Sequence, residues 1–301
     1  MKVIGEVQVL RESVRQERNA AMRQGREISV GLVPTMGFLH EGHASLLREA
    51  RAKNDLVVLS IFVNPIQFGP NEDFERYPRN EQSDLALAER EGVDIVFIPS
   101  VVEMYPKPAK TRIVVSELTS SLCGASRPGH FDGVTTVVSK LFHLVAPDYA
   151  YFGMKDAQQI AVIQQMVEDL NFDVTIEACP IVREEDGLAL SSRNVYLSSE
   201  DRKQALILSD SLQQVQHDLQ GDQKVTATEL VERVTGLIRS KPLANIDYVQ
   251  VLEFPTLNEI GRDVDLRHVE HDVIVAVAVK FGTTRLIDNV VISSKGVPVH
   301  V

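Results

Sequence analysis

The chain has 301 residues, of which 44% are hydrophobic and 24% are charged, and its formal net charge is −11. These values are typical of a globular protein with a large core, and the length favours two domains. The negative charge argues against a general nucleic-acid binder, because such proteins need a basic surface to displace counterions. The two cysteines, Cys123 and Cys179, are too few for a disulfide framework and indicate a reducing compartment.

The first residues show no pattern of a secretion signal, because the charged residues Glu6 and Arg11 interrupt the region where an apolar segment would lie. The longest purely apolar run, 273–279, is far too short to span a bilayer. We therefore expect a cytoplasmic protein with neither a membrane nor a nucleic acid as its partner.

The N-terminal part alternates short apolar runs with helical patterns. Strands are expected at 28–33, 56–63, 94–99, 112–115, 149–153 and 174–178, and helices at 9–24, 44–53, 84–91, 128–145 and 157–169. Continuous apolar runs are typical of strands that are buried on both faces of a sheet. This alternation predicts an α/β fold with a doubly wound parallel sheet.

The C-terminal part has a different texture. Two polar amphipathic helices are expected at 200–219 and 226–239, followed by strands at 246–252, 273–279 and 286–292. Helices followed by a run of strands predict a second, smaller α+β domain. We place the boundary at residue 182, to within about five residues, which gives domains 1–182 and 183–301.

The segment 34–43 (PTMGFLHEGH) joins the first buried strand to a helix. Gly37 and Gly42 allow a close approach of the backbone to a ligand, and a helix N-terminus favours phosphate. His40 and His43, three residues apart, can face one polyphosphate and donate to the charge that develops on it. The alternative is structural: His40 caps the turn, and His43 is a satisfied, partly buried side chain.

Gln67 and Lys155 each follow another buried strand, as His40 follows the first. Because ligands bind at the carboxyl ends of parallel strands, these three side chains are expected in one pocket. Gln67 can bind a small substrate with hydroxyl and carboxylate groups, and Lys155 can bind phosphate. Asp156 is a natural N-cap of the next helix, whose face also carries Gln159. Without other support, Gln67 would be taken as a loop stabiliser.

Ser191, Ser192 and Arg193 lie beside the predicted domain boundary. Two hydroxyls and a guanidinium in succession offer several donors for a triphosphate. Their place in a linker suits a lid that excludes water from a reaction. The alternative is an ordinary polar turn between domains.

Four blocks of the sequence resemble, in the right order, the pantothenate synthetase family of pantoate–β-alanine ligases. They are 34–43 (PTMGFLHEGH), 127–134 (RPGHFDGV), 152–159 (FGMKDAQQ) and 187–194 (GLALSSRN). The first block also resembles the wider nucleotidylyltransferase and class I synthetase superfamily. Leu190 stands where the family often has methionine, a change that conserves volume. The resemblance implies a Rossmann-like catalytic domain with a C-terminal lid domain, and a homodimer.

The same resemblance implies ligation of (R)-pantoate to β-alanine with ATP, through pantoyl adenylate, giving pantothenate, AMP and pyrophosphate. His43 would be the proton donor, and His40, Lys155 and Arg193 would be further catalytic residues. The implied ATP-binding residues are Met36, Gly37, Phe38, Leu39, His40, Glu41, Gly42, His43, Gly153, Met154, Lys155, Asp156, Val182, Leu190, Ser191, Ser192 and Arg193.

Gln67 and Gln159 would bind pantoate or β-alanine, by the same resemblance. Mg²⁺ should bridge phosphate oxygens with few protein ligands, and Asp84 is the candidate ligand that the chain offers. Arg127 and His130 have either a role at the site or a packing role at the start of a helix.

Two other functions remain open at this stage. A nucleotidylyltransferase would share the HxGH turn, but it should offer basic residues for a phosphorylated acceptor where this chain has Gln67 and Gln159. A non-catalytic nucleotide-binding module would be expected to lose Lys155 or the run 191–193, and this chain has both.

Overall fold

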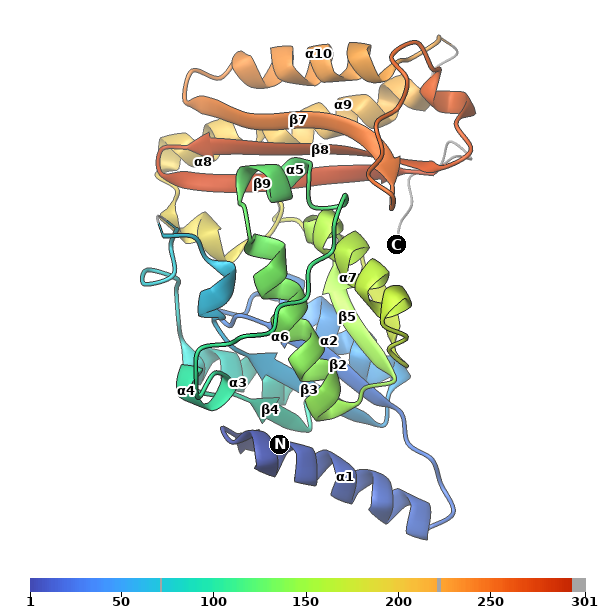
Figure 1. Cartoon of the computed structure of the whole chain (residues 1–301). Helices are drawn as coiled ribbons and strands as arrows, with labels where there is room; N and C mark the ends of the chain where they lie inside the picture. The colour runs from blue at the N-terminus through green and yellow to red at the C-terminus, as the bar shows by residue number, and fades with distance from the viewer. Residues whose placement is uncertain (71, 221–222, 294–301) are drawn as a thin grey trace. The chain divides into compact units, whose positions relative to one another are not determined.

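A computed structural model describes residues 1–70, 72–220 and 223–293, and these residues form two compact units (Figure 1). The first unit consists of Met1–Ser116, Arg127–Gly153 and Val162–Cys179. The second unit consists of Glu117–Ser126, Met154–Ala161 and the chain from Pro180 onward. Two short segments that precede residue 182 are thus part of the second unit. The simple division into 1–182 and 183–301 stays a prediction, and its residues 294–301 lie outside the described residues.

The first unit is built on a six-stranded sheet in which every pair of neighbours is parallel. Its strands are β1 (Lys2–Ile4), β2 (Val30–Thr35), β3 (Leu56–Ile61), β4 (Ile95–Phe97), β5 (Tyr149–Gly153) and β6 (Thr175–Cys179), in the order β1-β4-β3-β2-β5-β6. The chain builds outward from β2 to β3 and β4, and then adds β5 and β6 on the other side. The doubly wound parallel sheet is confirmed. Its topological switch point lies between β2 and β5, where such sheets bind ligands.

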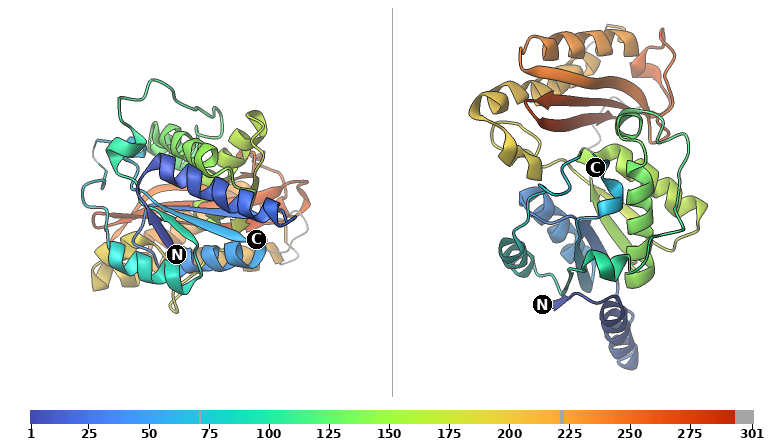
Figure 2. Two further views of the ribbon diagram at one scale, coloured as in Figure 1. Left: turned by 90° about the horizontal axis from the view of Figure 1, so that it is seen from below. Right: turned by 60° about the vertical axis from the view of Figure 1, so that its left-hand side comes forward.

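Helices cover both faces of this sheet, as the left-hand view of Figure 2 shows. Helices α1 (Val7–Arg23) and α6 (His130–Val145) lie on one face, and α2 (Glu41–Lys53) and α3 (Glu81–Arg90) lie on the other. All six residues of β3 are buried. Leu47 and Ala50 of α2 belong to the same buried cluster as Val57 and Leu59 of β3. Burial of apolar surface on both sheet faces accounts for the continuous apolar runs in the sequence.

The expected strand at 112–115 is wrong, because these residues pair with no strand. The backbone groups of Ile113 bond to side chains of α6 instead. Its N–H donates to Thr136 Oγ1 at 3.4 Å, and its C=O accepts from Thr135 Oγ1 at 2.6 Å. Strand β1 and the short helices α4 (Val101–Met104) and α5 (Leu122–Ser126) were not anticipated. Elements of three to five residues are too short to show a period.

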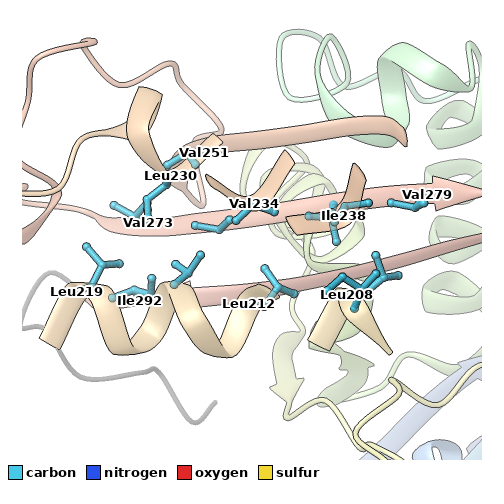
Figure 3. Close-up of a cluster of buried hydrophobic side chains, with 14 of the residues drawn as sticks. Leu208, Leu212, Leu219, Leu230, Val234, Ile238, Val251, Val273, Val279 and Ile292 are labelled. Carbon is cyan, nitrogen blue, oxygen red and sulfur yellow. The ribbon is translucent and has the colours of Figure 1, made fainter. Parts of the chain in front are cut away.

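The second unit contains a three-stranded antiparallel sheet with the order β7-β8-β9. Its elements are α8 (Ser199–Ala205), α9 (Ile207–Gln220), α10 (Ala227–Arg239), β7 (Ala244–Phe254), β8 (Asp272–Phe281) and β9 (Thr284–Ile292). Figure 3 shows side chains of α9 and α10 meeting those of the strands in one apolar cluster. The smaller α+β domain is confirmed.

The helix expected at 200–219 is interrupted at Leu206, the residue that follows the end of α8. The hydroxyl of Ser209 donates to the C=O of Leu206 at 3.1 Å. Such bonds from serine to a preceding carbonyl compete with the regular ladder and bend helices. Across both units, no described helix has the length and apolarity needed to cross a membrane.

Candidate active site

The turn between β2 and α2 is held in place by Asp84 of α3. The Asp84 carboxylate accepts the backbone N–H of Phe38 at 2.9 Å and that of Leu39 at 2.7 Å. Gly37 has φ of +83°, and a Cβ there would lie 3.0 Å from Asp84 Oδ2 and 2.9 Å from Ile61 Cγ2. Only glycine fits this position without displacement. Burial outweighs the two N–H bonds and raises the pKa of Asp84.

His40 and His43 are oriented by backbone N–H groups at the start of α2. His40 Nδ1 accepts from the N–H of Gly42, and His43 Nδ1 accepts from the N–H of His40, both at 3.2 Å. A neutral imidazole has one acceptor and one donor nitrogen, so each ring carries its proton on Nε2. The ring centroids are 4.1 Å apart. The turn therefore presents two Nε2–H donors from neighbouring rings, and the expected cap by His40 coexists with this arrangement.

The next residue of the turn, Glu41, is exposed and pairs with Arg48 further along α2. Glu41 is the first residue of the helix, where a carboxylate complements the positive end of the helix dipole. The geometry gives Glu41 a helix-stabilising contact.

Gln67 lies in the short 3₁₀ turn η1 (Pro65–Gln67), which follows β3. Its side chain is buried and contacts the turn between β2 and α2. Its Nε2 lies 3.1 Å from Met36 Sδ, and its Oε1 accepts from Asn64 Nδ2 at 3.2 Å. Asn64 also donates to the C=O of Gly133 at 3.0 Å. A Cβ on Gly133 would lie 2.5 Å from the Cα of Gln67. The first unit thus brings Gln67 to the segment 36–43.

Arg127 and His130 hold the backbone of Gln67. His130 Nδ1 donates to the C=O of Gln67 at 2.8 Å, and His130 Nε2 accepts from Arg127 Nη1 at 2.9 Å. Arg127 makes a two-pronged ion pair with Glu72, at 2.7 and 2.6 Å. Burial opposes the ionisation of Glu72, but its bonds with Arg127 prevail and lower its pKa. The sequence left the role of Arg127 and His130 open, and it gave no signal for Glu72.

In the second unit, Lys155 lies in the 3₁₀ turn η2 (Met154–Asp156), which follows Gly153, the last residue of β5. Asn289 of β9 donates through Nδ2 to the C=O groups of Met154 and Lys155, at 2.9 and 3.0 Å. The ammonium of Lys155 lies 3.9 Å from Asp156 Oδ2. This turn therefore has its backbone fixed and carries Lys155, a residue that is half-buried.

Helix α7 (Ala157–Asp169) begins directly after this turn. Gln159 is its third residue and is half-buried, and its neighbour Gln158 is buried. Gln158 Nε2 donates to the C=O of Leu118 and of Ser121, at 2.8 and 2.9 Å. These bonds tie the segment 117–126 to the start of α7. The same segment is bonded to β7, because the N–H of Leu122 donates to Gln250 Oε1 at 3.1 Å, which accounts for its place in the second unit.

The segment 182–190 forms a small hairpin before the expected phosphate-binding residues. The N–H of Leu190 donates to the C=O of Val182 at 3.0 Å, and Arg183 bridges to Ala189. Glu184, inside this hairpin, pairs with Arg202 of α8 at 2.7 Å. The hairpin is therefore fastened to the helical layer of its own unit.

Ser191, Ser192 and Arg193 follow the hairpin and open the 3₁₀ turn η3 (Ser192–Tyr196). Ser191 caps this turn, because its Oγ accepts the N–H of Arg193 at 3.3 Å. Asn194 Nδ2 donates to Glu184 Oε1 at 2.8 Å and to the C=O of Ala189 at 3.1 Å. The run 191–193 is thus a structured turn.

The predicted site residues fall into two groups, one in each unit. The first unit gathers the segment 36–43 with Gln67 and Asp84. The second unit gathers the turn 154–156 with Gln159, Val182 and 190–193. Sequence reasoning missed Asp288 and Asn289, which support the second group. Two adjacent polar residues inside the apolar run LIDNVVI were the available signal, because a buried polar side chain needs a partner.

No group of three or more histidine, cysteine, aspartate or glutamate side chains suited to a metal ion occurs within residues 1–70, 72–220 and 223–293. Asp84 directs both carboxylate oxygens to backbone N–H groups, although each oxygen has a second lone pair. The remaining lone pairs of its two oxygens are what Asp84 could offer to a metal ion.

Comparisons with known proteins agree with one another. The family profile described as pantoate-beta-alanine ligase matches residues 2–291. A pantothenate synthetase from Acetivibrio thermocellus is 54% identical over 292 residues, which cover 97% of this chain and 99% of that protein. A pantothenate synthetase from Thermoanaerobacter sp. strain X514 is 55% identical over 260 residues, covering 86% and 89% of the two chains.

Solved structures show the same similarity. The crystal structure of pantothenate synthetase from Thermus thermophilus matches with a TM-score of 0.85 and 45% identity, covering 96% of this chain and 98% of that one. A pantoate-beta-alanine ligase from Francisella tularensis, crystallised with beta-gamma ATP and beta-alanine, matches with a TM-score of 0.74 and 34% identity, covering 96% and 97% of the two chains. With the profile spanning nearly the whole sequence, this chain belongs to the pantoate–β-alanine ligase family.

Proposed function

We propose that the chain joins (R)-pantoate to β-alanine in an ATP-dependent, AMP-forming reaction that passes through pantoyl adenylate. The observation that carries this proposal is the pair of Nε2–H donors of His40 and His43 at the N-terminus of α2, with Gln67 against the same turn. The membership of the family supplies the substrates.

In the first step, a carboxylate oxygen of pantoate attacks the α-phosphorus of ATP. A P–O bond forms, the bond to the bridging oxygen of the β-phosphate breaks, and pyrophosphate leaves with that electron pair. Negative charge grows on the α-phosphate oxygens and on the leaving group. Preorganised donors aimed at this charge are the largest source of rate in such a site. We assign that task to His43, as proton donor, and to His40, Lys155 and Arg193.

In the second step, the amine of β-alanine attacks the acyl carbon of pantoyl adenylate. A C–N bond forms, the C–O bond to AMP breaks, and the amine loses a proton. Neither step needs a covalent enzyme nucleophile, so positioning of the substrates contributes most of the remaining rate.

The residues proposed to bind ATP come from three stretches. They are the segment 36–43, the turn 153–156 and the run 190–193. Val182, which bonds to Leu190, is proposed to bind ATP with them. The backbone N–H groups at the start of α2 favour phosphate. Gln67 and Gln159 are proposed to hold the hydroxyl and carboxylate of pantoate, since an amide both donates and accepts.

We further propose that Mg²⁺ accompanies ATP, that the enzyme is a homodimer, and that it acts in the cytoplasm. Mg²⁺ usually keeps several waters and binds through substrate phosphates with one or two carboxylates. When bound, the ion would neutralise phosphate charge. Asp84 remains the predicted protein ligand of the ion. The contacts of Asp84 with the N–H groups of Phe38 and Leu39 favour a different role, in which it positions the turn between β2 and α2.

Isotope transfer tests the proposed adenylate. Pantoate labelled with ¹⁸O in its carboxylate, mixed with ATP, Mg²⁺, β-alanine and the enzyme, should yield AMP that contains one ¹⁸O atom. Mass spectrometry of the nucleotide reads this directly. Label in inorganic phosphate, together with ADP, would instead show an acyl phosphate and would overturn the proposal.

A further inference from the structure

Two polar residues interrupt the apolar strand β9, and both are buried. Asp288 is 2% exposed and Asn289 is 5% exposed, while Leu286 and Ile292 of the same strand belong to the apolar core. Buried polar groups are costly unless they are hydrogen-bonded. The hydrogen bonds of Asp288 and Asn289 therefore show why β9 has polar residues at these two positions.

Asn289 supports the turn that carries Lys155. Its Nδ2 donates to the C=O of Met154 at 2.9 Å and to that of Lys155 at 3.0 Å. Both hydrogens of one amide group are thus used on consecutive carbonyls. These bonds fix the peptide planes on either side of the Lys155 Cα, and with them the direction in which that side chain leaves the backbone.

Asp288 supports the hairpin before Ser191. Its carboxylate forms a two-pronged ion pair with Arg183, with Nη1–Oδ2 at 2.6 Å and Nη2–Oδ1 at 3.0 Å. It also accepts the N–H of Asn289 at 2.8 Å. Arg183 in turn donates to the C=O of Gly187 at 3.2 Å. The buried carboxylate is fully engaged, which is the condition under which such a pair is stable.

Successive side chains of a strand point to opposite faces of its sheet. One dipeptide can therefore reach two separate segments, and here it reaches η2 from one face of β9 and the hairpin 183–189 from the other. Because β9 is an edge strand, chain segments can approach it without a further strand between them. One of these segments carries Lys155, and the other leads directly into the run 191–193. Lys155 and this run are the residues of the second unit to which we assign the phosphates of ATP.

We propose that Asp288 and Asn289 are positioning residues for ATP, which set the place of Lys155 relative to the run 191–193 without touching the nucleotide. This inference rests on the proposed function, because that function assigns Lys155 and the run 191–193 to the phosphates of ATP. A wrongly placed Lys155 or Arg193 weakens phosphate binding even though its own side chain is intact.

The test compares Asp288→Asn and Asn289→Ala with the control variant Asp265→Asn. Asp265 forms a matching two-pronged ion pair with Arg267 in the same unit, at 3.0 and 2.6 Å, and its other bonds to described backbone groups go to Val225 and Arg267. Three quantities are measured for each variant: the KM for ATP, the free energy of unfolding, and the amide hydrogen exchange of peptides covering 153–159 and 183–194.

We expect Asp288→Asn and Asn289→Ala to raise the KM for ATP by about tenfold, the loss equivalent to one good hydrogen bond. Exchange should accelerate at 183–194 in the first variant and at 153–159 in the second. Asp265→Asn should lose comparable stability but keep the parental KM for ATP and the parental exchange in both peptides. An equal rise in KM for all three variants, or unchanged exchange in the two peptides, would overturn the inference.

The failure of the proposed function has a different signature. If the parent enzyme makes no pantothenate, the function is wrong, whereas the exchange pattern still decides whether the pair holds the two turns. If the parent is active and Asp288→Asn behaves like Asp265→Asn, the function stands and the positioning role fails.

Discussion

Backbone N–H groups set the tautomers of His40 and His43, and this is the feature on which the proposed chemistry depends most. Each Nδ1 accepts an N–H from the turn, so the proton of each neutral ring is on Nε2. The same contacts stabilise the start of α2. The proposed catalytic role and the structural role therefore fall on the same residues, and a substitution must separate them.

His43→Gln makes this separation. Glutamine at the third position of a helix can still accept the N–H of the capping residue, so we expect nearly parental stability. The amide keeps an N–H donor but cannot release a proton, so pantoyl adenylate formation should fall by about 10²–10⁴-fold, the usual contribution of a general acid. Single-turnover adenylate formation is measured, beside the control His217→Ala in α9. A parental rate in His43→Gln would remove His43 from the mechanism.

Asp84 offers a second test at the scale of one residue. Asp84→Asn turns an amide donor toward a backbone N–H of Phe38 or Leu39, so unfolding should become easier by about 1–3 kcal/mol. Because the turn loosens, adenylate formation should slow, while the Mg²⁺ concentration for half-maximal rate should not change. Urea unfolding and magnesium titration of the rate measure these effects.

Asp148→Asn is the matched control for Asp84→Asn. Asp148 also accepts a backbone N–H, that of Val30 at 2.6 Å, at the other end of β2. This variant should lose stability without a change in rate. If Asp84→Asn instead requires much more Mg²⁺, then Asp84 acts as a ligand of the metal, as the sequence predicted, and the role through the turn would be contradicted.

The sequence predicts residues for this site more readily than it predicts the residues that support them. HxGH between a buried strand and a helix carries a chemical meaning because spacing and local geometry are both visible in the sequence. The contacts of Asp84 with the turn join residues 45 and 46 positions apart in the chain. Such a long-range bond leaves no periodic trace, so Asp84 was noticed only as an isolated acidic residue.

At the scale of elements, the loop after β3 is tied to the start of α6 through Glu72, Arg127 and His130. His130 bonds to the C=O of Gln67 and to Arg127, and Arg127 forms an ion pair with Glu72. The ion pair is more than half buried on both sides, with 18% and 25% of the two side chains exposed. Removing one partner of such a pair costs more than breaking an exposed pair, because it leaves a partly buried charge unpaired.

We expect Glu72→Gln and Arg127→Leu each to raise the KM for pantoate by about tenfold, equivalent to about 1.4 kcal/mol. The reason is that Gln67, the proposed pantoate ligand, loses the support of its carbonyl. The KM for ATP should change much less. Steady-state kinetics with each substrate varied in turn measures both.

The control for this pair is Arg51→Leu, which breaks the ion pair of Arg51 with Asp94, at 2.7 Å, in the same unit. It should leave the KM for pantoate at the parental value. The double variant of Glu72 and Arg127 should be no worse than either single one, since residues of one network are not additive. Equal weakening of pantoate and ATP would show a general loss of structure and would contradict the assignment.

Most helices and strands could be predicted because apolar runs and helical periods are local. The elements that could not be predicted depend on contacts between residues that are distant in the sequence. Residues 112–115 have strand-like composition, but the hydroxyls of Thr135 and Thr136 satisfy the backbone of Ile113, so no strand pairing follows. The helix expected to begin at residue 84 begins at Glu81, because Asn80 caps it through the N–H of Ser83.

At the scale of the whole molecule, the chain combines an N-terminal parallel sheet with a C-terminal α+β layer, as the change of texture near residue 182 predicted. The sequence could not show that 117–126 and 154–161 belong to the second unit. Side-chain bonds between distant residues hold these segments: Gln158 bonds to Leu118, Ser121 and Gly124, and Asn289 of β9 bonds to the C=O groups of Met154 and Lys155. A buried glutamine in a helical pattern does not reveal its partners.

The most direct test of the account is exchange of labelled pyrophosphate into ATP, measured with Mg²⁺ and without β-alanine. A reversible adenylate predicts exchange that depends on pantoate, that is lost with His43→Gln, and that is diverted to pantothenate and AMP when β-alanine is added. No exchange in the presence of pantoate, from protein that binds ATP, would contradict the account and would exclude pantoate as the group that is adenylated.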